Sequence, residues 1–160
     1  MAEKIHRTLE LLSRGFGDFM VTYNVWTDGS KGEHGDAGIG VVVVNRDYDG
    51  IDFLLGEYIG RETSNYAEFY AVVRALEEIY ERIEHPEAVH ITIKSDSQLL
   101  VKGMNGEHKI QAPKLVQLKS RIERLHMKLK TEPEYIWVRA HVGNKMNELA
   151  DFLAVKAMAG

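Results

Sequence analysis

The stretch that indicates the fold most clearly is FMVTYNVWTDGS, residues 19–30. Apolar or β-branched side chains occupy every second position from Phe19 to Thr27, which is the period of a strand with one buried face. Asp28-Gly29 then predicts the end of that strand. An acidic side chain beside a buried strand is costly to desolvate unless something pairs with it. Asp28 is therefore a candidate functional residue.

The segments that follow alternate between strand and helix patterns. Residues 41–44 and 51–59 predict two further strands, which form an antiparallel meander with the first. Thr63 or Ser64 is predicted to cap a long helix that ends near His85-Pro86. A strand over 89–95, helices over 98–104 and 113–129, a strand over 135–138 and a helix over 145–159 complete the chain. The order βββαβααβα predicts an α/β fold, a mixed five-stranded sheet with helices on both faces.

The chain of 160 residues is long enough for one domain with a sizeable core. Ile5, Leu9, Leu12 and Phe16 recur at helical spacing, so residues 1–18 predict an amphipathic helical extension, which leaves 19–160 as the domain. There is no cysteine and no apolar run long enough to span a membrane. Charged residues near the start make a poor signal peptide. We expect a cytoplasmic monomer with no membrane association and no evident protein partner.

Positive charge is concentrated in residues 102–130. That segment carries eight Lys or Arg residues against two Glu, whereas the whole chain has a net charge of −4. Such asymmetry can create a basic surface on an acidic protein. The alternative interpretation is a solvated helix face with no binding role.

Four carboxylates have distinct local signatures. They are Asp28 in TDGS, Glu68 in NYAE, Asp96 in SDSQ and Asp151 in NELAD. Asp28 and Asp96 end strands that we expect to be parallel, so they emerge at the same sheet edge, where open α/β sheets bind ligands. Glu68, in the first turn of the long helix, and Asp151, in the closing helix, can point over that edge. Four converging carboxylates favour a hard divalent cation, and two such ions fit best.

These motifs resemble ribonuclease H, type 1, over residues 19–159. The resemblance rests on TDGS at 27–30, GRETSNYAE at 60–68, SDSQ at 95–98 and the pattern H-x-G-x-x-x-N-E-x-A-D from His141 to Asp151. It implies the ribonuclease H-like fold for residues 19–160. It also implies an endonuclease that hydrolyses the RNA strand of RNA–DNA hybrids, leaving 5′-phosphate and 3′-hydroxyl ends.

The resemblance assigns a role to each catalytic residue. Asp28 would bridge two Mg²⁺ ions, with Mn²⁺ as an alternative ion. Asp151 would complete the site of the ion that activates the attacking water, and Glu68 and Asp96 the site on the leaving-group side. His141 would assist proton transfer and product departure, for which an imidazole that titrates near neutrality is suited.

The resemblance also implies substrate contacts. The 2′-hydroxyls of RNA are exposed in a wide, shallow minor groove. The residues expected against that groove are Ser64, Asn65 and Gln98, with neighbouring backbone groups. Gly29 and Ser30 are further expected substrate contacts. Arg61 and Thr63 match a pocket for a phosphate of the DNA strand. Without the resemblance, Arg61 reads as a surface cation and Thr63 as a helix cap.

One feature of longer members is missing. They insert a basic protrusion bearing a tryptophan, for which residues 105–112 are too few. Trp26 and Trp137, the two tryptophans of this chain, are predicted to lie in the core. Basic residues of segment 102–130 would compensate in part for the protrusion.

Three alternatives stay open at the level of sequence. The first is a catalytically silent module that binds RNA–DNA hybrids, and the second is another nuclease or DNA-strand transferase of the ribonuclease H-like superfamily. In the third, the four acids merely cap helices and turns. The last explains each acid singly but not their joint placement.

Overall fold

The computed structural model describes residues 20–47, 50–140 and 144–159. Its strands are β1 (Val21–Lys31), β2 (Asp36–Asn45), β3 (Gly50–Arg61), β4 (Val89–Ser95) and β5 (Glu134–Trp137). Its α-helices are α2 (Ser64–Arg82), α3 (Gln98–Met104), α4 (Pro113–Leu129) and α5 (Lys145–Ala159), and a 3₁₀ turn, η2 (Pro86–Ala88), precedes β4. The predicted element order is confirmed. The helical extension predicted for residues 1–18 lies outside the described residues.

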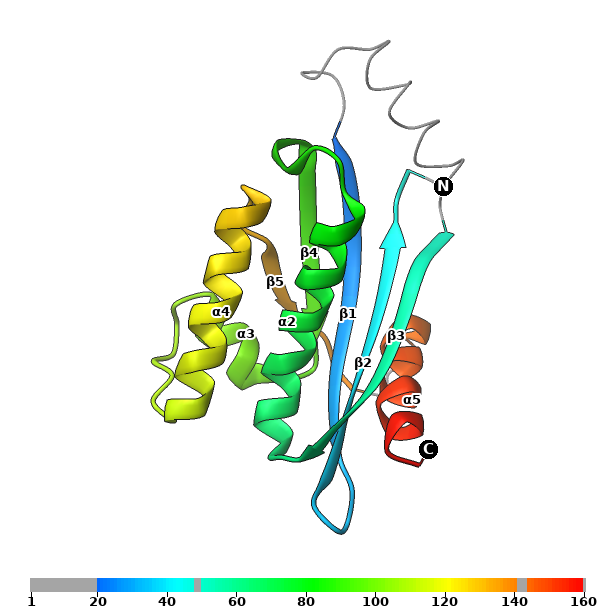
Figure 1. Cartoon of the computed structure of the whole chain (residues 1–160), viewed down its shortest axis with the longest axis vertical. Helices are drawn as coiled ribbons and strands as arrows, with labels where there is room; N and C mark the ends of the chain where they lie inside the picture. The colour runs from blue at the N-terminus through cyan, green and yellow to red at the C-terminus, as the bar shows by residue number, and fades with distance from the viewer. Residues whose placement is uncertain (1–19, 48–49, 141–143, 160) are drawn as a thin grey trace.

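The sheet is mixed, as predicted, with strand order β3-β2-β1-β4-β5 (Figure 1). β1, β2 and β3 form the antiparallel meander, while β1–β4 and β4–β5 are parallel pairs. A parallel pair needs a crossover, and α2 and then α3 with α4 provide the two crossovers. The carboxyl ends of β1, β4 and β5 therefore lie at one end of the sheet, the lower end in Figure 1.

Helices cover both faces, also as predicted. α2, α3 and α4 lie on one face, and α5 lies on the other, against β2, β1 and β3 (Figure 1). The larger core cluster lies under α2 and α4 and includes the fully buried Phe69, Leu76 and Ile122. Within the described residues, no helix is long and apolar enough to cross a bilayer.

α5 packs closely because the strands beneath it carry glycine. A Cβ on Gly38 would meet the carbonyl oxygen of Ala154, and one on Gly40 would meet that of Ala150. At Gly56 the nearest atom would be the Leu153 oxygen, 3.1 Å away. The helix backbone therefore rests directly on the sheet.

Three local predictions are wrong. β1 does not end at Asp28-Gly29 but continues to Lys31, because its pairing with β2 extends to Lys31 and Ala37. Glu68 lies in the second turn of α2, because Thr63 is the N-cap and Ser64 the first helical residue. Trp137 is 41% exposed, since it is the last residue of the edge strand β5, whereas Trp26 is buried as predicted.

Candidate active site

Three of the four predicted carboxylates converge. Asp28 on β1, Glu68 on α2 and Asp96 just after β4 each place a carboxylate oxygen within 4.8 Å of the others. Asp28 is 4% exposed and Glu68 6%, while Asp96 is half-buried. Oxygen ligands from several elements, facing one point at the carboxyl end of the sheet, are suited to a hard divalent cation.

The convergence follows from where β1 and β4 separate. Their parallel pairing ends at Trp26 and Lys94, so Asp28 and Asp96 each lie two residues beyond the last paired position. β1 nevertheless stays paired with β2 at that point. Asp28 is thus held on a strand whose β4 side has opened toward the site.

Gly29 brings α2 to the same point. A Cβ at this position would collide with the backbone of Ala67 and Glu68, so the absence of a side chain allows the helix to lie against β1. The Gly29 N–H donates a hydrogen bond to Oε1 of Glu68, and the Ser95 hydroxyl lies 3.5 Å from Oε2. Both carboxylate oxygens of Glu68 are therefore oriented by the ends of β1 and β4.

Asp151 joins the cluster from the opposite face of the sheet. Gly40 is the cross-strand partner of Asp28, and the Ala150 carbonyl of α5 lies directly over Gly40. The next residue of α5, Asp151, forms a hydrogen bond with the Asp28 carboxyl. Asp28 therefore lies between Asp151 on one side and Glu68 and Asp96 on the other.

The electrostatics favour a bound cation. Burial, then the charges of Glu68 and Asp96 and the hydrogen bond with Asp151, raise the pKa of Asp28 to about 10. Burial, followed by the charge of Asp96, raises the pKa of Glu68 to about 8, although the bond from Gly29 opposes this shift. A divalent cation would lower both pKa values and remove the repulsion. The donor set therefore fits the predicted metal.

The loop after β4 is anchored from two sides. The Ser95 hydroxyl accepts a bond from the Ser97 N–H at 3.0 Å, and the Ser97 hydroxyl caps α3 by accepting from Leu100 at 3.2 Å. The exposed Trp137 donates its indole N–H to the Asp96 carbonyl at 3.2 Å. Sequence reasoning missed this role of Trp137 because it expected a buried side chain.

The predicted substrate contacts lie near this end of the sheet. Ser30 follows Gly29 in β1, Ser64 and Asn65 form the exposed start of α2, and Gln98 is the exposed first residue of α3. His141 lies outside the described residues, so its predicted role is untested.

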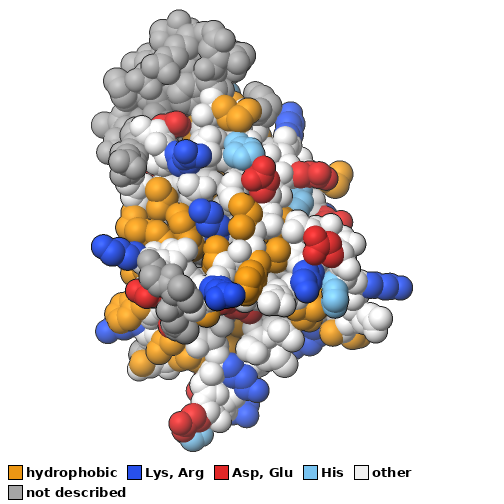
Figure 2. Space-filling model, turned by 180° about the vertical axis from the view of Figure 1, so that it is seen from behind, with side chains coloured by type: hydrophobic (Ala, Val, Ile, Leu, Met, Phe, Trp, Pro, Cys, Tyr) orange, Lys and Arg blue, Asp and Glu red, His pale blue; other side chains and the backbone are white. Residues whose placement is uncertain are grey.

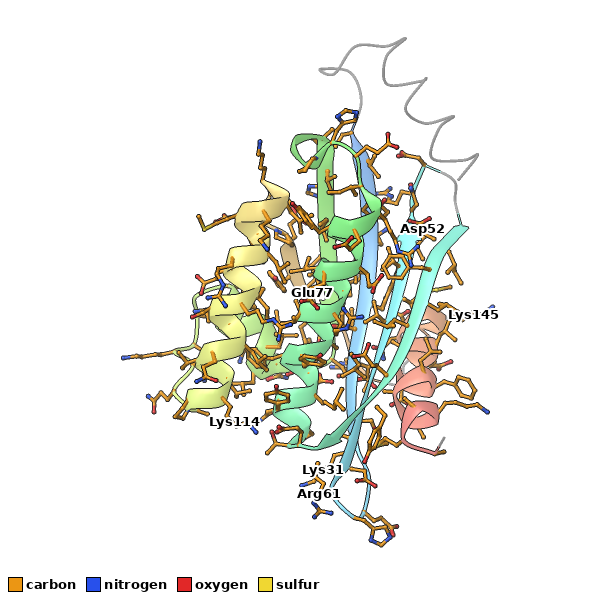
Figure 3. All side chains as sticks on the ribbon, viewed as in Figure 1. Lys31, Asp52, Arg61, Glu77, Lys114 and Lys145 are labelled. Carbon is orange, nitrogen blue, oxygen red and sulfur yellow. The ribbon has the colours of Figure 1, made fainter. Side chains whose placement is uncertain are left out.

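Arg61 and Thr63, the predicted phosphate contacts, also have structural partners. The Thr63 hydroxyl accepts from the Tyr66 N–H at 3.0 Å, which is the cap suggested by the simpler interpretation. Nη1 of Arg61 donates to the His34 carbonyl at 2.6 Å, in the β1–β2 hairpin that projects at the foot of the molecule (Figures 1 and 3). Seen from behind, that projection carries charged side chains of both signs (Figure 2).

Part of the positive charge of α4 is directed at α2 and at Glu62, which precedes that helix. Lys114 forms an ion pair with Glu62 at 2.6 Å and Arg121 one with Glu77 at 2.9 Å. Lys114 also lies over the ring of Tyr66, 4.9 Å from its centroid. Lys114 and Glu77 are labelled in Figure 3. These two cations are therefore less available to a substrate than the charge balance alone predicts.

Comparison with known proteins agrees with this geometry. The family model described as RNase H matches residues 21–159. The bifunctional protein Rv2228c of Mycobacterium tuberculosis is 32% identical over 81% of this chain, which spans only a third of that relative's length. A ribonuclease H of Francisella philomiragia is 31% identical, with 84% of this chain and 89% of the relative covered.

A solved structure gives the same result in three dimensions. LC11-RNase H1, crystallised in complex with RNA/DNA hybrid, superposes with a TM-score of 0.73 at 26% identity, covering 86% of this chain and 96% of that chain. The five-stranded mixed sheet, the carboxylate cluster and the span of the family model lead to one conclusion. The chain belongs to the RNase H family.

Proposed function

We propose that this protein is an endonuclease that hydrolyses the RNA strand of RNA–DNA hybrids, leaving 5′-phosphate and 3′-hydroxyl ends. The observation that carries the proposal is the buried cluster of Asp28, Glu68 and Asp96, joined by Asp151, in a chain of the RNase H family. The hybrid as substrate is supported by the related LC11-RNase H1, whose structure is a complex with RNA/DNA hybrid.

The proposed cofactor is a pair of Mg²⁺ ions, with Mn²⁺ as an alternative. When bound, such a pair activates water and stabilises charge on the attacking and leaving oxygens. Asp28 would contribute to both ions, because it lies between Asp151 and the Glu68–Asp96 pair. Asp151 would serve the side of the attacking water, and Glu68 with Asp96 the side of the leaving oxygen.

The chain's own groups would orient these ligands. The Gly29 N–H and the Ser95 hydroxyl hold the two oxygens of Glu68 in place. Trp137 and the cap at Ser97 hold the backbone around Asp96. Ligands fixed before the substrate arrives need little reorganisation during reaction. His141 is proposed as the group that assists proton transfer and product departure.

Recognition of the hybrid is proposed to come from Gly29, Ser30, Ser64, Asn65 and Gln98 in the minor groove. Arg61 and Thr63 would bind a DNA phosphate, using the donors of Arg61 that do not bond to His34. We also propose that the protein works as a cytoplasmic monomer. Without cysteine, the fold needs no disulfide bond and therefore no oxidising compartment.

A gel assay tests the function. Labelled RNA–DNA hybrid, duplex DNA and duplex RNA are incubated with the protein in Mg²⁺ and in EDTA. We expect cutting of the RNA strand of the hybrid alone, in Mg²⁺ only, and loss of at least about 1,000-fold of the rate in Asp28→Asn.

Asp52→Asn is the matched control, because Asp52 lies on β3 toward the opposite end of the sheet (Figure 3) and is exposed. Equal cutting of all three duplexes would refute the substrate assignment. Cleavage that survives EDTA would refute the proposal that the reaction requires a divalent metal ion. A protein that binds hybrid but does not cut it would support the catalytically silent alternative.

A further inference from the structure

A cavity of about 420 Å³ lies between α3 and β5. Its lining includes Gln98, Lys102 and Asn105 from α3 and its C-cap, Glu107 from the following loop, and Ile136 and Trp137 from β5. This volume is in the range of sites that hold a small molecule, and therefore of one nucleotide. None of the catalytic carboxylates lines this cavity.

The cavity nevertheless adjoins the catalytic cluster. Trp137 forms one wall, and its indole N–H is bonded to the carbonyl of Asp96 at 3.2 Å. Gln98, on the opposite wall, follows Asp96 by two residues. The Val138 N–H donates to the Ser95 carbonyl at 2.9 Å, which ties the end of β5 to the end of β4. A nucleic acid strand at the carboxylates would therefore pass close to the mouth of the cavity.

The aromatic wall is held in one orientation. Trp137 is 41% exposed although its polar atom is already satisfied, so its free surface is the apolar ring. Beside it, Asn105 donates its amide to the Tyr135 carbonyl at 3.1 Å, which joins α3 to β5 and fixes the width of the cavity. A pre-oriented aromatic face is a platform on which a base or sugar can pack, and every base offers a π-face.

The lining of the cavity carries one positive and one negative side chain, which have opposite effects on a bound nucleotide. Lys102 and Glu107 are both exposed, and they are the cation and the anion among the lining residues. A phosphate would be attracted to Lys102 and repelled by Glu107. The two side chains therefore predict opposite effects on the binding of a nucleic acid, which makes the inference testable from both directions.

We infer that this cavity is a binding subsite for one nucleotide of the RNA–DNA hybrid, flanking the cleaved position, with its base or sugar against Trp137 and its phosphate toward Lys102. The inference rests on the proposed function and adds Trp137, Lys102 and Glu107 to the substrate contacts.

Fluorescence anisotropy with a labelled hybrid tests the subsite in an Asp28→Asn background, which prevents cleavage. Stacking of a base on an aromatic side chain contributes to the affinity for a nucleic acid strand, so we expect Trp137→Ala to weaken binding about 10-fold. Trp137→Phe should stay within about 3-fold, because it keeps a ring and loses only the bond to Asp96. Equal losses of hybrid affinity in the two variants would overturn the inference, because Trp137 would then act through its hydrogen bond to Asp96 and not as an aromatic surface for the nucleotide.

The charged pair supplies the second measurement. Lys102→Ala should weaken binding and reduce the slope of log affinity against log salt by about 1, whereas Glu107→Gln should strengthen binding. Lys128→Ala and Glu81→Gln are the matched controls, because both residues are exposed and lie in the last turns of α4 and α2. These two helices end at the upper end of the helical layer (Figure 1). Effects of the same size in the controls would overturn the subsite.

Failure of the inference can be told from failure of the proposed function. If the parent protein prefers hybrid over duplex DNA and cuts it in Mg²⁺, but the Trp137 and Lys102 variants bind hybrid as tightly as the parent, only the subsite is refuted. If the parent shows no preference for hybrid, the proposed function itself is refuted. Thermal melting of each variant verifies that it is folded.

Discussion

Metal binding to this protein should release protons, and the number is set by the buried carboxyls. In the absence of metal, the pKa of Asp28 is about 10 and that of Glu68 about 8. At pH 7, Asp28 is then fully protonated and Glu68 about nine-tenths protonated. Carboxylates must lose their protons to coordinate a cation. We therefore expect about two protons to be released per protein when Mg²⁺ binds at pH 7.

The same pKa values fix how the release changes with pH. At pH 9, Glu68 is already about nine-tenths ionised, while Asp28 is still about nine-tenths protonated. The release should therefore fall to about one proton. Both pKa values are raised first by burial and then by neighbouring carboxylates.

Isothermal titration calorimetry measures this number directly. Mg²⁺ is titrated into the protein at pH 7 and at pH 9, each in three buffers that differ in enthalpy of protonation. The slope of the observed heat against that enthalpy gives the protons released. Asp52→Asn serves as a control and should leave the slope unchanged. A heat that does not depend on the buffer at pH 7 would refute the reasoning, because the carboxyls would then be ionised before metal binds.

Three further predictions concern stability without metal. Gly40→Ala should lower the free energy of unfolding by about 1–3 kcal/mol and abolish cleavage, because its Cβ would push α5 off the sheet; urea denaturation and the gel assay check this. Asp28→Asn should stabilise the protein increasingly from about pH 4 to about pH 10. Over that range the native carboxyl keeps a proton that the unfolded chain loses, so the stability of the wild type falls as pH rises. Urea denaturation in EDTA at pH 6 and pH 9 measures this, and the same difference in free energy of unfolding between variant and wild type at both pH values would contradict the prediction. Thr63→Ala should cost about 1 kcal/mol in thermal melting, through loss of the bond from Tyr66, and Thr63→Ser should restore most of it.

Most of the fold could be predicted from local patterns. The helices at 98–104, 113–129 and 145–159 begin and end where the sequence predicts, because Ser97, Pro113 and the apolar spacing act within one turn of helix. The strand order also follows, since helical crossovers force parallel pairing. Three carboxylates converge because β1, the end of β4 and the second turn of α2 meet at one edge of the sheet.

What the sequence did not predict depends on contacts between distant elements. Gly29 looks like the end of a strand, but its function is to admit the backbone of α2, which no local pattern encodes. Trp137 has the alternation of a buried strand residue, yet it is the last residue of an edge strand and is 41% exposed. The ion pairs of Lys114 and Arg121 likewise depend on how α4 faces α2.

The glycines beneath α5 fix the distance between this helix and the sheet. A side chain between helix and sheet could adjust its rotamer to absorb a change, but at Gly38 and Gly40 the nearest atoms of α5 are backbone carbonyl oxygens. The distance between Asp151 on α5 and Asp28 on β1 is therefore set by contacts between backbone atoms, which cannot change rotamer. During divergence of the family, a larger residue at position 40 could be accepted only if the acid on α5 moved or lengthened with it. These two positions, far apart in the chain, should thus change together or not at all.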